Sequence, residues 1–175
     1  MKNLERYLNS FGKQVVNRAK GNLKRRDKVV TGKLLNSVKY NLVKTKDGYS
    51  VEFSMLDYGK FIDKGVSGTK KKRSFVDYKG QTKTSPFSYG KSRDGGLTKG
   101  LDKWIVRRGI APRDAKGRFI SRKSLKFLIA RKIYLYGKQG ISFFQKPLGL
   151  GLKQFGKEML GSVKEDIIEN LTTVK

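Results

Sequence analysis

The sequence contains neither cysteine nor histidine among its 175 residues. Without cysteine, disulfide bridges and thiolate chemistry are excluded. Without histidine, the chain lacks the commonest general base and the commonest transition-metal ligand. Any catalysis would depend on carboxylates, lysine, tyrosine or serine alone. We therefore expect a protein that is not an enzyme and that holds no cofactor and no metal.

Acidic residues are scarce as well, because 14 Asp and Glu stand against 41 Lys and Arg, which gives a net charge of +27. The net charge is +9 over residues 1–65, +7 over 66–100, +10 over 101–140 and only +1 over the last 35 residues. A charge of this size repels itself and favours a polyanion or acidic neighbours nearby. A solubilising surface is the plainer alternative, but it rarely requires such an imbalance. The charge indicates a polyanionic setting.

Long apolar runs are also missing. No run approaches the roughly 18 apolar residues of a membrane span, so no membrane contact is expected. The first residues are charged throughout and lack the apolar region of a secretory signal, so no export is expected. Hydrophobic residues nevertheless make up 37% of the chain, which is enough for a core. The length fits a single domain over residues 1–175.

Apolar residues at three- and four-residue steps predict helices over residues 3–26, 121–136 and 148–171, with a shorter helix over 101–108. The long N-terminal helix carries a basic face beside its apolar stripe. The last helix is expected to bury its own stripe, which consists of Leu152, Phe155, Met159, Val163, Ile167 and Leu171.

The pattern changes to alternation over residues 38–43 and 49–55, on either side of Asp47-Gly48. Alternation around such a dipeptide predicts an antiparallel hairpin. A short helix is expected after it, ended by Gly65 in a left-handed C-cap position. We therefore expect an α+β fold in which the long N-terminal helix and the C-terminal helices pack on a small sheet built around the hairpin.

Residues 66–120 are predicted to form a long, basic, loop-rich insertion, and 66–100 shows no period. The run Lys70–Arg73 is expected to leave the compact fold as an arm or loop that contacts DNA or acidic surfaces of adjoining proteins. Aromatic residues of the insertion would anchor it to a neighbouring subunit. The cations expected to contact DNA or a partner are Lys70, Lys71, Lys72, Arg73, Lys79, Lys83, Arg107, Arg108, Arg113 and Arg118.

More specific phosphate chemistry finds little support. A metal-dependent nuclease needs clustered carboxylates, and Asp114 does have the acid-x-lysine spacing to Lys116. It lies between Pro112 and Gly117 without a partner acid, so a turn aspartate is the favoured interpretation. The segment "GVSGTKKKRS" lacks the spacing of a phosphate-binding P-loop. Backbone electrostatics with nucleic acid stays open.

Three short segments have a recognisable order. "TGKLLNSV" precedes the hairpin, "YGKFIDKG" follows it, and "ISFFQKPL" (141–148) precedes the last helix. This order resembles the tail-completion (head–tail joining, neck) proteins of tailed bacteriophages, well over residues 1–68 and loosely over 121–171. The matched residues are Thr31, Gly32, Leu34, Ser37, Tyr58, Gly59, Phe61, Asp63 and Gly65. Plain structural roles are expected for them. Thr31 would cap a helix, Gly32 and Gly65 would form backbone turns, and Tyr58 and Phe61 would pack in the core.

The resemblance implies a structural virion protein, without catalytic residues, that forms a ring of six or twelve copies in the neck or tail around the DNA channel. Its partners would be other copies, the portal or adjacent ring proteins, and genomic DNA through non-specific electrostatics. It would be made in the cytoplasm of the bacterial host. The alternative is a non-specific DNA- or RNA-binding architectural or ribosome-associated protein, which explains the charge but not the ordered segments.

Overall fold

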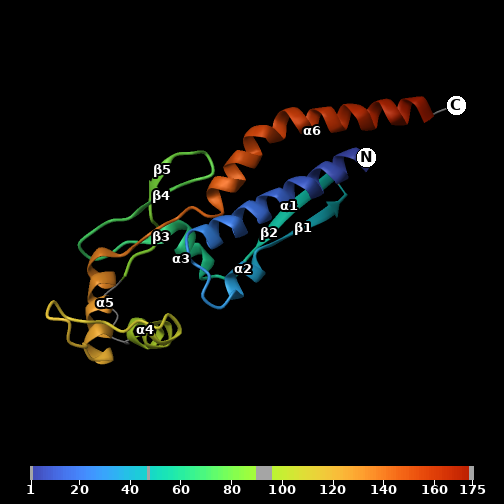
Figure 1. Cartoon of the computed structure of the whole chain (residues 1–175). Helices are drawn as coiled ribbons and strands as arrows, with labels where there is room; N and C mark the ends of the chain where they lie inside the picture. Colours follow the sequence, from blue (N-terminus) through green and yellow to red (C-terminus); the bar gives the residue numbers. More distant parts are fainter. Residues whose placement is uncertain (1, 47, 90–95, 174–175) are drawn as a thin grey trace.

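The computed structural model of the chain describes residues 2–46, 48–89 and 96–173 (Figure 1). It confirms the α+β class, with helices at both ends of the chain and short antiparallel strands between them. The elements, in chain order, are α1 (Lys2–Arg25), α2 (Lys33–Ser37), β1 (Lys39–Thr45), β2 (Gly48–Ser54), α3 (Gly59–Lys64), β3 (Gly65–Val66), β4 (Ser74–Val76), β5 (Thr82–Thr84), α4 (Gly96–Arg107), α5 (Arg122–Tyr136), β6 (Lys138–Gln139) and α6 (Gln145–Thr173).

The main core lies around α1, which packs against the β1–β2 hairpin and against α6 (Figure 1). The predicted N-terminal helix is confirmed, because Phe11, Val15, Ala19 and Leu23 recur at helical steps and are all buried. Phe143, just before α6, is fully buried in the same cluster. Burial of this stripe places the hairpin and α6 on α1.

The predicted hairpin is also confirmed. β1 and β2 pair antiparallel, with Tyr40 opposite Phe53 and Leu42 opposite Val51. The turn residue Asp47 lies outside the described residues. Because side chains alternate across a strand, one face of the hairpin points its larger residues at α1, while the other is polar.

α6 runs along α1, so the start of α1 and the end of α6 lie at the same end of the molecule (Figure 1). The carboxylate of Asp166 accepts the N–H groups of Asn3 and Leu4, at 3.0 Å each. These N–H groups belong to the first turn of α1, where no intrahelical acceptor exists. α6 therefore caps α1 as well as covering it.

The predicted stripe of α6 is confirmed in part, because its members Phe155, Met159 and Val163 are half-buried. Phe155 packs on Phe11 with ring centroids 5.2 Å apart, and Gly151 and Asp166 are buried. Leu152 and Ile167, in contrast, are 41% and 50% exposed. A Cβ on Gly151 would lie 2.7 Å from Phe11, so α6 approaches α1 closely at this residue. The Leu171 side chain lies outside the described residues.

The segment predicted to be aperiodic contains paired strands where it is described. β3 pairs with β6 and β4 pairs with β5, each as a separate two-stranded sheet. These strands are two or three residues long, which is too short for alternation to show in a sequence. α4 and α5 pack on each other at the end of the molecule opposite the termini (Figure 1).

Two local predictions meet different outcomes. The expected cap at Thr31 is wrong, because α2 begins after Gly32, whose φ is 72°, and no side chain caps its first turn. Gly65 ends α3, as expected, and its φ of 75° is positive, but its ψ of −179° lies outside the left-handed helical conformation that was predicted. A Cβ there would lie 2.4 Å from the backbone nitrogen of Gly140. Glycine at residue 65 therefore serves both the turn and the close approach of β3 to β6. Among the helices of the described ranges, none has the length and apolar character that crossing a bilayer requires.

Candidate polyanion-binding surface

The lysine run is fixed to the end of α5. The N–H groups of Thr69 and Lys70 donate to the carbonyls of residues 134 and 135, at 3.0 and 2.8 Å, and Arg73 Nε donates to the Tyr136 carbonyl at 2.6 Å. Carbonyls in the last turn of a helix have no intrahelical donor, so the run caps α5. The prediction of an arm leaving the compact fold is therefore wrong, although the side chains of residues 70–72 are exposed.

Three of the predicted contact residues are already engaged with carboxylates. The ion pairs are Lys83–Asp77 at 2.8 Å, Arg108–Asp27 at 2.7 Å and Arg118–Asp114 at 3.0 Å. Arg108 also donates through Nη2 to the backbone carbonyl of Asp27 at 3.0 Å, which ties the end of α4 to the link after α1. These cations stabilise local structure, and their charge is balanced nearby.

Asp77 organises the turn between β4 and β5. Its Oδ1 accepts the N–H groups of Lys79 and Gln81, both at 2.9 Å, and its side chain is almost fully buried. The hydrogen bond from Lys83 is the main cause that lowers the pKa of Asp77, and Asp77 in turn raises the pKa of Lys83. Lys83 is therefore part of a turn rather than a free contact for DNA.

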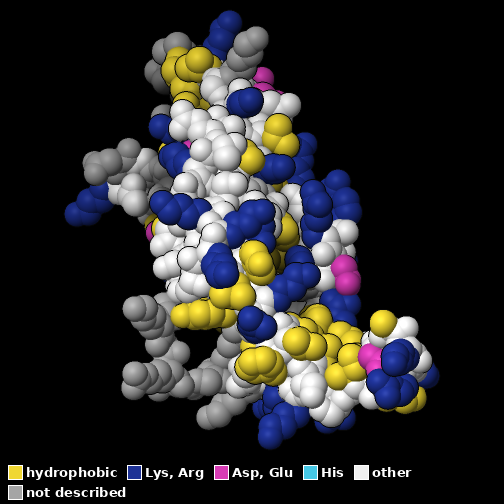
Figure 2. All heavy atoms as spheres, turned by 90° about the vertical axis from the view of Figure 1, so that its left-hand side faces the viewer, with side chains coloured by type: hydrophobic (Ala, Val, Ile, Leu, Met, Phe, Trp, Pro, Cys, Tyr) yellow, Lys and Arg dark blue, Asp and Glu magenta, His cyan; other side chains and the backbone are white. Residues whose placement is uncertain are grey.

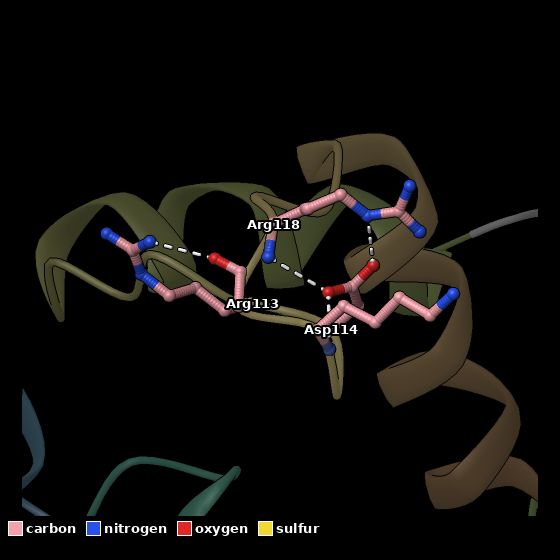
Figure 3. A network of polar contacts seen from close by, with 5 residues as sticks. Arg113, Asp114 and Arg118 are labelled. Atoms are coloured by element: carbon pink, nitrogen blue, oxygen red, sulfur yellow. Dashed lines mark hydrogen bonds and ion pairs between the residues drawn. The ribbon is translucent and has the colours of Figure 1, made fainter.

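Asp114 is used in the same way by the turn at 114–118 (Figure 3). Its Oδ1 accepts the N–H groups of Lys116 and Arg118 at 2.9 Å, and its Oδ2 accepts from Arg118 Nε. The backbone hydrogen bond from Arg118 is the largest cause that lowers the pKa of Asp114. Over the residues that the structure describes, no three acids gather as metal ligands would. The geometry agrees with a turn aspartate.

Arg113 holds the other side of this turn. Its Nη1 donates to the Gly117 carbonyl at 2.8 Å (Figure 3), and its guanidinium lies 3.9 Å from the ring centroid of Phe119. Arg113 and Phe119 are paired across the turn, and both side chains are exposed. The loop-rich insertion thus contains a small, internally bonded hairpin that presents two arginines and an aromatic ring.

The remaining predicted contacts stay open to solvent. In the described part of the chain, no carboxylate pairs with the exposed side chains of Lys70, Lys71, Lys72, Lys79 and Arg107. Figure 2, which views the end formed by α4 and α5, shows Lys and Arg spread over the whole face with few acids. Hydrophobic side chains gather in the lower half of that face among the cations. The face combines positive charge with apolar surface.

An open cleft of about 1260 Å³ was not predicted from the sequence. It lies between the link after α1, α3, the β3–β6 and β4 strands, and the end of α4. Cations and aromatic residues make up ten of its 22 described lining residues. They are Arg26, Lys28, Arg108, Lys138, Lys146, Tyr58, Phe61, Phe75, Tyr89 and Trp104. Asp27 is the one carboxylate among the described lining residues, and Arg108 already binds it. No sequence pattern signals the cleft, because its walls come from segments far apart in the chain.

Tyr58 and Phe61 stand at the mouth of this cleft rather than in the core. They are 42% and 46% exposed, so the predicted core packing is wrong for both. Phe61 packs edge-on against Phe87, with ring centroids 4.7 Å apart. α3 is only six residues long, and its inner side is occupied by Gly59 and Asp63, so the two rings point outward.

Three of the other matched residues, Leu34, Ser37 and Gly59, form one junction. Ser37 Oγ donates to the Leu34 carbonyl at 2.8 Å and accepts the N–H of Leu56 at 3.1 Å. A Cβ on Gly59 would lie 2.9 Å from Leu34 Cδ1. The segments before and after the hairpin therefore pack directly on each other, and their residues locate a fold rather than a chemical site.

Comparison of the chain with models of protein families, with curated proteins and with solved structures finds no match. Function must therefore be inferred from the residues and geometry of the chain itself.

Proposed function

We propose that the chain is a structural virion protein of a tailed bacteriophage, one that forms a ring of identical subunits in the neck or tail around the DNA channel. The observation that carries the proposal is the junction of the two ordered segments. Ser37 bonds Leu56, and Leu34 closes on Gly59, so the segments that resemble neck proteins act as one packing unit on either side of the hairpin.

Exposed apolar surface on the C-terminal helices supports assembly. Large exposed apolar side chains on α5 are Phe127, Leu128 and Tyr136, and on α6 they are Leu150, Leu152, Leu160, Ile167 and Ile168. Large exposed patches of apolar side chains mark protein–protein interaction sites. Other copies of the chain, with the portal or adjacent ring proteins, are the partners we propose for these faces.

The charge supports a position beside DNA. Lys70, Lys71 and Lys72 project from a backbone that is held on α5, and no described carboxylate neutralises them. Lysines facing phosphate give an attraction that carries no sequence information and is screened by salt. A channel wall needs such diffuse attraction, because DNA must pass along it. The proposal requires no catalytic step.

Quantitative mass spectrometry of purified particles, calibrated against the major capsid protein, tests this function. Particles are treated with nuclease and washed at high salt first, because a chain of net charge +27 would otherwise adhere to released DNA. We expect a fixed count of six or twelve per particle that survives the wash. Purified chain added to particles lacking it serves as the control for adhesion. Absence from washed particles would overturn the proposal.

The scarcity of acids also favours a second candidate, a non-specific architectural or ribosome-associated nucleic-acid-binding protein. This protein would bind duplex DNA or RNA tightly as an isolated monomer, with affinity that falls steeply as salt rises. Tight monomeric binding together with absence from particles would select this candidate over the virion ring.

A further inference from the structure

Two lysines from distant parts of the chain meet in the cleft. Lys28 follows the end of α1, and Lys138 lies in β6. The side chain of Lys138 is exposed, yet loss of solvation in the cleft is the main cause that lowers its pKa, and the positive charge of Lys28 lowers it further. Nearby like charges disfavour the charged form of each group, and a bound anion would relieve that repulsion. The carboxylate of Asp27 does not balance the two lysines, because Arg108 already binds it at 2.7 Å.

Exposed aromatic rings stand beside these cations. Tyr58 and Phe61 both line the cleft, and nearly half of each side chain is exposed. The edge-on contact with Phe87 fixes the orientation of Phe61, so little freedom is lost when a second ring stacks on it. Trp104 adds a further aromatic wall from α4. A cationic groove with fixed aromatic rings is the combination that binds unpaired nucleotides.

We propose that this cleft binds a single-stranded nucleic-acid segment, with phosphates at Lys28 and Lys138 and bases stacked on Tyr58 and Phe61. A duplex keeps its bases stacked inside and can offer only phosphates, so it leaves the rings unused. An acidic peptide would satisfy the lysines but has no regular series of flat faces for the rings. The site differs from the exposed run Lys70–Lys72, and it does not depend on the ring function.

Fluorescence anisotropy with the full-length chain tests the site. The probes are a labelled oligothymidylate, a duplex of the same length, thymidine monophosphate and a polyglutamate peptide. We expect the single strand to bind more tightly than the duplex at equal salt. Changing Tyr58→Ala and Phe61→Ala together should weaken single-strand binding by about fivefold or more. A factor of about five is the smallest loss of affinity expected when a base loses its stacking partner. Binding of the duplex should not change.

The phosphate contacts have their own test. Changing Lys28→Ser and Lys138→Ser together should reduce the slope of log affinity against log salt by about 1.4 for the single strand, at about 0.7 per contact. Lys44→Ser with Lys46→Ser is the matched control, because both lysines are exposed at the far end of the hairpin and neither lines the cleft. This control pair should leave the slope nearly unchanged. Circular dichroism melting verifies that each variant folds.

Four results would overturn the proposal. The first is equal affinity for the duplex and the single strand, and the second is an equal reduction of the salt slope in the Lys44/Lys46 control variant. The third is displacement of the labelled strand by polyglutamate at a lower concentration than by unlabelled strand. The fourth is an affinity for thymidine monophosphate comparable to that for the single strand. The first two would assign binding to general charge, the third to an acidic peptide and the last to a free nucleotide. The number of copies per particle is independent of this cleft, so either idea can fail alone.

Discussion

Asp63 Oδ1 accepts the backbone N–H of Phe144 at 2.9 Å, between residues 81 positions apart in the chain. The Ser142 N–H also donates to the Asp63 carbonyl at 2.9 Å. Phe144 directly precedes α6, where N–H groups lack intrahelical acceptors, so Asp63 caps α6 from the end of α3. Asp63 is 1% exposed, so the acidic residue of the matched segment "YGKFIDKG" serves as a helix cap.

The charge of this cap predicts a pH dependence. Burial raises the pKa of Asp63, and the N–H groups of Phe144 and Gln145 oppose that effect only in part. A raised native pKa means that the folded state binds the proton more tightly, so this residue's contribution to stability falls as pH rises from 3.8 through the native pKa. Asp63→Asn keeps an acceptor oxygen without charge and should be at least as stable as the wild type at pH 7.

Urea unfolding measures this difference. Asp63→Ala should lose about 1–3 kcal/mol, because it leaves a buried N–H without an acceptor. The advantage of Asp63→Asn over the wild type should shrink as pH falls below the native pKa of Asp63. Equal destabilisation by Asn and Ala at pH 7 would show that the carboxylate charge itself holds α6.

Replacing either of two glycines of α1 by alanine should have opposite effects on the stability of the chain. A Cβ on Gly12 would lie 2.3 Å from the Tyr40 ring, whereas nothing lies within 4 Å of a Cβ on Gly21. Gly12→Ala should destabilise the chain by about 1–3 kcal/mol through overpacking of α1 on the hairpin. Gly21→Ala should stabilise it by about 0.5–1 kcal/mol, because alanine favours a helix interior. Thermal and urea unfolding check both, and effects of equal sign would contradict the packing.

Substitutions at neighbouring cations of the basic run should affect either stability or DNA binding, depending on the residue. Arg73→Ala removes the donor at the last carbonyl of α5 and should cost about 1 kcal/mol of unfolding free energy. Changing Lys70, Lys71 and Lys72 together to serine should leave stability nearly unchanged. It should reduce the salt slope of duplex binding by about 2.7, at about 0.9 per phosphate contact. An unchanged slope would remove the run from the DNA-facing surface.

Replacement of exposed apolar residues on α6 should impair assembly. Leu160 and Ile167 are exposed, so Leu160→Ser with Ile167→Ser should change the unfolding free energy by less than about 0.5 kcal/mol per site. If α6 docks on another subunit, the number of copies per particle should fall sharply. Lys153→Ser, an exposed polar change on the same helix, is the control. An undiminished count would exclude this stripe from the interface.

Periodicity located the elements whose pattern is long enough to read. The stripe of α1, the alternation on either side of Gly48 and the pattern of α5 each span seven residues or more, and the structure has all three. The periods arise from backbone geometry alone, so no tertiary contact is needed to find them. β3, β4, β5 and β6 are too short for this, and the close approach of α6 to Phe11 at Gly151 is a contact that no local pattern shows.

The sequence by itself determined the charge, the absence of histidine and cysteine, the α+β class and the order of the matched segments, because these are properties of composition and short-range pattern. Only the tertiary structure decided which cations are free. Lys83 and Arg108 meet carboxylates, while Lys28 and Lys138 meet each other beside exposed aromatic rings. Pairing depends on which side chains folding brings together, and those partners lie up to 110 positions apart in the chain. The Arg108–Asp27 ion pair, the cap of α6 by Asp63 and the cleft therefore exist only in the folded chain, whereas the Arg118–Asp114 pair is local.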